Sequence, residues 1–91
     1  MTTVRIPPVL RETVGGAREL SAIGGTVREV LDDLFAAQPG LAARVAPDGE
    51  LSSFINVYVN GRDVRYTDGL LTEIGPSDTV ILLPAMAGGA A

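Results

Sequence analysis

The sequence predicts an α+β domain in which a mixed sheet of four to five strands is covered by one main helix. Three observations predict this class. Short apolar or alternating runs, separated by turn residues, indicate strands. One stretch has the apolar spacing of an amphipathic helix. The 91 residues, of which 46% are hydrophobic, are enough for one modest core and too few for two domains.

An opening hairpin is predicted at the start of the chain. Residues Thr3 to Ile6 alternate and then meet Pro7-Pro8, which cannot donate to a strand ladder. A turn or irregular stretch from Pro8 to Glu12 is expected next. After Gly15-Gly16, the run Ala17 to Ser21 is expected to be the second strand of the hairpin.

The main helix is predicted to begin after Thr26. The Thr26 hydroxyl can accept from the amide of Glu29, and Glu29 stands where a capping box needs its carboxylate. Apolar residues then recur at helical spacing, at Val27, Val30, Leu31 and Leu34. The helix should end before Pro39-Gly40, and Leu41 to Val45 is expected to add a short second turn.

A second hairpin and a last strand are predicted in the remainder of the chain. Phe54 to Val59 and Arg62 to Tyr66 flank Asn60-Gly61, the pair best suited to a two-residue turn. A short segment from Leu70 to Ile74 precedes the last strand, Thr79 to Leu83. This order is that of the β-grasp fold, and a right-handed crossover through the helix places the first and last strands side by side.

Two-residue periodicity divides these later strands between two faces. The side chains expected to face the helix are Ile55, Val57, Val59, Val80 and Leu82. Leu83, Ile81 and Tyr58 then lie on the opposite face, which would leave an apolar patch for docking a partner. The alternative, held equal, is that the segment from Leu41 to Ser53 folds over this face.

Composition excludes several classes of function. The chain has neither Cys nor His, and all seven of its basic residues are arginines, so no catalytic residue, metal ligand or bound cofactor is predicted. The domain is therefore not expected to be an enzyme. A net charge of −4 with dispersed arginines argues against nucleic-acid binding. No membrane-spanning run or signal peptide is evident, and a cytoplasmic location is expected.

The end of the chain carries the strongest functional signal, because Gly88-Gly89 stands shortly after the last strand. Glycine can adopt any backbone conformation and pass through a narrow channel. From Pro84 to Gly89 an extended chain spans about 20 Å, enough to enter a deep cleft. We therefore expect a folded domain, residues 1–84, and a flexible tail, residues 85–91. On the glycine pair alone, a frayed end without function is the alternative.

Several stretches of the sequence resemble the ubiquitin-like sulfur carriers of the MoaD and ThiS type, and most closely the CysO-like carriers of cysteine synthesis. The resemblance runs through nearly the whole chain. It rests on Val9-Leu10-Arg11-Glu12, Phe54-Ile55-Asn56-Val57-Tyr58-Val59-Asn60, Asp63-Val64-Arg65-Tyr66, Asp78-Thr79-Val80 and Leu83-Pro84-Ala85-Met86-Ala87-Gly88-Gly89. The last string is the most specific, because it joins a strand, a spacing and the glycine pair in one register.

The resemblance implies a protein that is a co-substrate of other enzymes. An adenylating sulfurtransferase of the ubiquitin-activating type would use ATP to activate the Gly89 carboxylate, and a sulfur source would convert the adenylate to a thiocarboxylate. Ala87 and Gly88 would thread the channel of that enzyme. In this chain Ala90-Ala91 follow Gly89 and block its carboxylate. Cleavage between Gly89 and Ala90 by a JAMM-type metallopeptidase is therefore implied.

The sulfur acceptor stays open at this point. In the CysO-like case it is an aminoacrylate held by a pyridoxal-phosphate cysteine synthase, which makes cysteine biosynthesis the first expectation. Molybdopterin, thiamin and a secondary metabolite are the alternatives. A ubiquitin-like protein modifier, joined to lysines of other proteins, and a binding module that is never activated are different classes of function that the sequence also allows.

Overall fold

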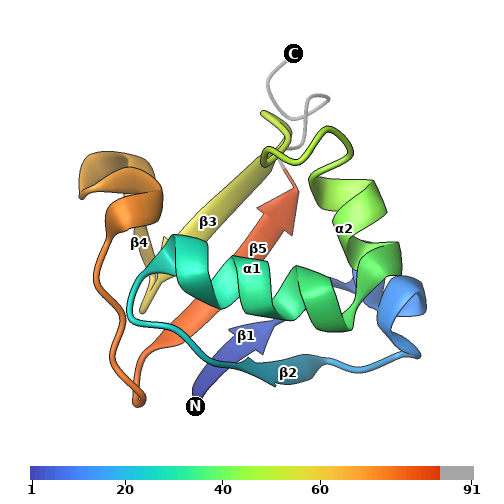
Figure 1. Ribbon diagram of the computed structural model, residues 1–91, viewed down its shortest axis with the longest axis horizontal. Helices are drawn as coiled ribbons and strands as arrows, with labels where there is room; N and C mark the ends of the chain where they lie inside the picture. The colour runs from blue at the N-terminus through green and yellow to red at the C-terminus, as the bar shows by residue number, and fades with distance from the viewer. Residues whose placement is uncertain (85–91) are drawn as a thin grey trace.

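The computed structural model describes residues 1–84 of the 91-residue chain. One mixed sheet lies behind α1, which crosses it as Figure 1 shows. The strands are β1 (Thr2–Arg5), β2 (Glu19–Ala22), β3 (Ile55–Val59), β4 (Arg62–Asp63) and β5 (Thr79–Pro84). The helices are α1 (Val27–Ala37) and α2 (Pro39–Val45), with 3₁₀ helices η1 (Pro8–Val14), η2 (Val64–Tyr66) and η3 (Gly69–Leu71). No helix among these residues is long and apolar enough to cross a membrane.

The strand order in the sheet is β2-β1-β5-β3-β4, which places the first and last strands side by side as predicted. β1 and β5 run parallel, with Val4 opposite Val80. β5 also pairs with β3 in the antiparallel sense, so it is the central strand. The predicted β-grasp arrangement, a mixed sheet with one main helix across it, is confirmed.

The main helix begins as the sequence predicted. The Thr26 hydroxyl accepts from the backbone N–H of Glu29 at 3.2 Å. The Glu29 carboxylate reaches back to the N–H of Gly25 at 2.7 Å, one residue before the usual position in a capping box. Asp33, on the same helix, accepts from the backbone N–H of Ile23 and so ties α1 to the end of β2.

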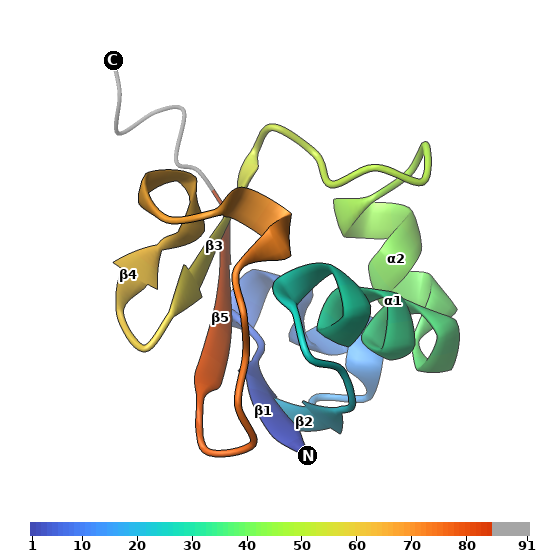
Figure 2. The ribbon, with the colours of Figure 1, turned by 60° about the vertical axis from the view of Figure 1, so that its left-hand side comes forward.

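The segment after α1 is more ordered than expected and lies on the same side of the sheet. Pro39 begins the full helix α2 in place of a short turn. Leu41 and Val45 are completely buried, and Leu51 packs against the same core. Figure 2 shows α1 and α2 on one side of the sheet. The alternative in which Leu41 to Ser53 covers the opposite face is therefore wrong.

The predicted strand from Arg62 to Tyr66 is wrong beyond its second residue. The hairpin turn itself forms, because Asn60 and Gly61 both have positive φ angles, 51° and 87°. At Asp63, however, the carboxylate accepts from the backbone N–H of Arg65 at 2.9 Å. This local hydrogen bond competes with strand pairing and turns the chain into η2.

The opening hairpin also differs in detail. The stretch expected to be irregular after Pro7 is the 3₁₀ helix η1, which ends at Val14 and is capped by Gly15 with a φ of 68°. Burial of Leu10 and Val14 from η1 fixes this segment against the core. The second strand begins at Glu19, two residues later than predicted.

The division of β5 between two faces is confirmed. Val80 and Leu82 are fully buried in the core beneath α1, together with Val57 from β3. Leu83, the next residue along β5, is 40% exposed. Ile55 and Val59 are partly buried and pack against the same core, as the alternation predicted.

We predict a large loss of stability for one of two neighbouring substitutions in β5 and almost none for the other. Leu82→Asp places a carboxylate in a site with 0% exposure and should cost about 4 kcal/mol or more of unfolding free energy. Leu83→Asp, the matched control, should change it by less than about 1 kcal/mol because that side chain already meets solvent. Thermal denaturation followed by circular dichroism measures both. A stable Leu82→Asp beside an unfolded Leu83→Asp would mean that the faces are reversed.

Candidate functional site

The residues with predicted chemical roles lie beyond the described part of the chain. Ala87, Gly88, Gly89 and Ala90 belong to residues 85–91, which are outside the described residues. The last described residue, Pro84, ends β5 and pairs with Ile55 of β3. The structure therefore describes β5 as far as the residue just before the predicted tail.

The three residues predicted for partner docking are brought together on the sheet. Tyr58 of β3 lies directly opposite Ile81 of β5, and Leu83 lies opposite Asn56 one step further along. Alternation puts all four side chains on the face away from α1. Tyr58 and Ile81 are partly buried and Leu83 is exposed. We call Tyr58, Ile81 and Leu83 the docking face.

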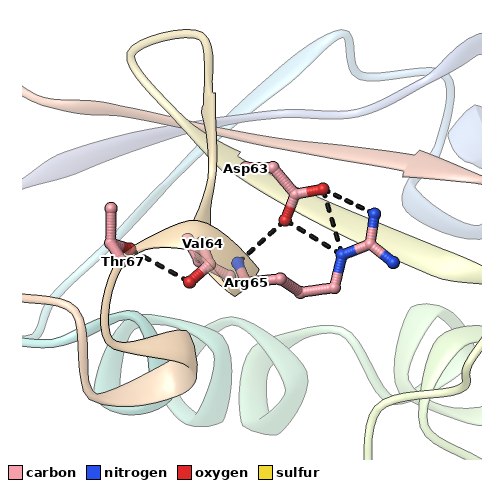
Figure 3. Close-up of polar contacts among 4 residues, drawn as sticks. All are labelled: Asp63, Val64, Arg65 and Thr67. Atoms are coloured by element: carbon pink, nitrogen blue, oxygen red, sulfur yellow. Dashed lines mark hydrogen bonds and ion pairs between the residues drawn. The ribbon is translucent and has the colours of Figure 1, made fainter.

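An ion pair next to the docking face was not predicted from the sequence. Asp63 lies opposite Tyr58 in the β3–β4 register, and its side chain is only 7% exposed. The Arg65 guanidinium donates to it from Nη2 at 2.7 Å and from Nε at 3.1 and 3.2 Å, as Figure 3 shows. Side-chain hydrogen bonds from Arg65, followed by its backbone N–H, lower the pKa of Asp63 below its ordinary value. The only sequence signal was an acidic and a basic residue two positions apart.

A second polar network fixes the start of β5. The Asn60 amide donates to Asp78 at 2.8 Å and accepts from the backbone N–H of Thr79 at 2.9 Å. Asp78 also accepts from the backbone N–H of Gly75 at 2.8 Å, and this bond is the main cause of its lowered pKa. The network holds the β3–β4 turn against the first residue of β5. It thereby supports the register that sets Ile81 opposite Tyr58.

The docking face carries little chemistry of its own. Within residues 1–84, acidic side chains form no group of three or more that could hold a metal ion. The polar groups described above bond to one another and to the backbone. What this face offers chemically is an apolar and aromatic surface of the kind that is common at protein interfaces.

The fold and this site define a ubiquitin-like β-grasp protein with an apolar sheet face beside its C-terminal strand. The chain belongs to the ThiS family, whose model matches residues 4–89. It is 44% identical over 90 residues to the sulfur carrier protein CysO of Mycobacterium tuberculosis, covering 96% of this chain and 97% of that relative. The predicted resemblance is confirmed, and it supports a general role as a sulfur carrier.

Solved structures agree with this assignment. The BexX/CysO complex of Amycolatopsis orientalis contains a chain with a TM-score of 0.86 and 45% identity, covering 98% of this chain and 100% of that one. The small archaeal modifier protein 1 of Methanosarcina acetivorans has a TM-score of 0.83 and 30% identity, with coverages of 97% and 95%. The first of these relatives is therefore known in complex with another protein.

We predict that Asp63 contributes stability that acid removes. Its folded-state pKa is lowered, so its contribution is complete above the unfolded pKa and is lost as the pH falls through the folded pKa. Asp63→Asn should therefore melt at a lower temperature near neutral pH, and should lose less stability between about pH 5 and about pH 2. The exposed loop residue Asp48 provides the matched control, Asp48→Asn. Identical pH profiles for the two variants would contradict the role of the ion pair.

Proposed function

We propose that this protein is a sulfur carrier whose Gly89 carboxylate is adenylated, converted to a thiocarboxylate and used to donate sulfur in biosynthesis. One observation carries the proposal: the ThiS family match ends at residue 89, the second glycine of Gly88-Gly89. The glycine pair thus falls at the end of the family domain. The similarity to CysO over nearly the whole chain supports the same role.

The chemistry proceeds in two steps in the active site of an adenylating sulfurtransferase. A Gly89 carboxylate oxygen attacks the α-phosphorus of ATP, and pyrophosphate leaves. A sulfur donor then displaces AMP from the acyl carbon and leaves a thiocarboxylate. The carrier supplies only the carboxylate, in keeping with a sequence that has no Cys or His for nucleophilic catalysis. ATP binds to the enzyme, and the carrier itself holds no cofactor.

The docking face is our proposed contact with this enzyme. Tyr58, Ile81 and Leu83 offer an aromatic and aliphatic surface of the kind that anchors protein interfaces. Leu83 stands six residues before Gly89 in the sequence. A partner bound at this face is therefore within reach of the glycine pair. Ala87 and Gly88, which have the smallest side chains, suit a narrow channel leading to the reacting carbon.

Two further partners complete the proposed cycle. Because Ala90 makes a peptide bond with Gly89, a JAMM-type metallopeptidase first exposes the carboxylate. In cysteine biosynthesis the thiocarboxylate sulfur then adds to an aminoacrylate on a pyridoxal-phosphate synthase. The acyl group moves from sulfur to nitrogen, and hydrolysis releases cysteine and restores the Gly89 carboxylate. The CysO similarity favours this acceptor over molybdopterin, thiamin or a secondary metabolite.

A protein modifier is the second candidate function. It is favoured by the structural similarity to small archaeal modifier protein 1 at 30% identity. In this case the activated Gly89 would form an isopeptide bond with a lysine of another protein. Both functions need the same carboxylate, and they differ only in the nucleophile that attacks the adenylate.

We predict that the full-length chain is inactive until it is processed. Incubated with ATP, the adenylating enzyme and a sulfur source, residues 1–89 should form thiocarboxylate, whereas residues 1–91 should form it only when the peptidase is added. In the uncut chain the Gly89 carbonyl is part of an amide with Ala90, and an amide has no carboxylate oxygen to attack ATP. Intact-mass spectrometry detects the exchange of oxygen for sulfur. Equal conversion of both forms without peptidase would refute the processing step.

A further inference from the structure

A groove beside the docking face has an arginine-lined wall. It has a volume of about 300 Å³ and lies between β5, which contributes Ile81 and Leu83, and the chain after β1. Among residues 1–84, the charged residues that line it are Arg5 and Arg11. The protein as a whole carries a net charge of −4, so the charge of this groove is opposite to that of the molecule.

The groove exists because β1 ends earlier than β5. The parallel register between these strands stops where Arg5 lies opposite Ile81. Pro7 and Pro8 follow, and neither has a backbone N–H to extend the ladder. β5 nevertheless continues to Pro84, paired with β3 on its other side. The last residues of β5 therefore border an open groove in place of a neighbouring strand.

Arg11 is held at this groove without a carboxylate partner in residues 1–84. Its Nε donates to the backbone carbonyl of Ile6 at 3.0 Å, and its side chain is partly buried. Arg5 differs, since its guanidinium lies 3.8 Å from the Glu19 carboxylate. The ion pairs of the described residues involve Arg5, Arg28, Arg44 and Arg65. The Arg11 guanidinium is thus positioned by its bond to Ile6, and no carboxylate of residues 1–84 pairs with it.

We propose that this groove receives an acidic side chain of the adenylating enzyme, which Arg11 binds while Ile81 and Leu83 make the adjoining apolar contact. The inference rests on the proposed function and names a recognition contact within it. The groove is continuous with the docking face because both include Ile81 and Leu83. A guanidinium fixed by one of its nitrogens can still bind a carboxylate through the others, and charge pairing of this kind sets orientation and association rate.

The proposed contact gives a role to η1, a segment that takes no part in the chemistry at Gly89. In η1, Leu10 is buried in the core and holds the 3₁₀ helix in place. Glu12 faces Arg44 of α2, with their side-chain atoms 3.4 Å apart. Arg11, between them, is directed to the groove. The two flanking residues therefore fix the segment that presents Arg11.

The test measures binding of residues 1–89 to the adenylating enzyme of the same organism, by calorimetry at low and high salt. Arg11→Gln should raise the Kd about tenfold at low salt and make it less dependent on salt. Arg11→Lys should recover part of the lost affinity, because it keeps the positive charge. The matched control is Arg28→Gln, on α1 and outside the groove, which should bind as the wild type does. Melting temperatures establish that each variant is folded.

The outcomes separate this inference from the proposed function. If the wild type is adenylated and Leu83→Asp binds weakly, but Arg11→Gln keeps the wild-type Kd and salt dependence, the groove contact is wrong and the docking face stands. If Arg11→Gln and Arg28→Gln weaken binding equally, the loss of affinity comes from the change in net charge, and the groove contact is also wrong. If the wild type is neither bound nor adenylated, the proposed function fails, and this inference fails with it.

Discussion

The central position of β5 is the constraint on which the rest of the structure depends. This strand pairs with β1 on one side and β3 on the other, and its residues Val80 and Leu82 are fully buried. Because successive side chains of a strand point to opposite faces, burying these two residues beneath α1 requires Ile81 and Leu83 to lie on the other face. The same strand thus supplies the core, the docking face and the point from which residues 85–91 continue.

Polar contacts near β5 stabilise this arrangement and fix where the paired strands begin and end. The Asn60 and Asp78 side chains fix the start of the strand, while Asp63 and Arg65 end β4 beside Tyr58. At the other end, the two prolines after β1 leave the last residues of β5 without a paired strand on that side within residues 1–84. β5 is therefore paired on both sides where it contributes Val80 to the core, and it is paired only with β3 near Leu83, where a partner is proposed to bind. Burial and backbone hydrogen bonding thus determine which edge of β5 is available for a contact.

The sequence predicted those features that depend on neighbouring residues. The cap of α1, the Asn60-Gly61 turn and the two faces of β5 follow from spacing alone and were confirmed. The end of β4 was missed because the hydrogen bond from the backbone N–H of Arg65 to the Asp63 carboxylate outweighed an alternating pattern. The groove at Arg11 was missed because it joins η1 to β5, about 70 residues apart in the sequence. The predicted roles of Gly88 and Gly89 lie outside the described residues and rest on the family match.

The central claim is that Gly89 carries sulfur, and mass spectrometry of the protein isolated from its native cells tests it most directly. Our account predicts a population that ends at Gly89 and is heavier than the free carboxylate form by the exchange of one oxygen for sulfur. Treatment with an alkylating reagent should label that terminal thiocarboxylate, since the chain has no cysteine to react in its place. Finding Gly89 in isopeptide linkage to lysines of other proteins, with no sulfur-bearing form, would contradict the account and favour the modifier.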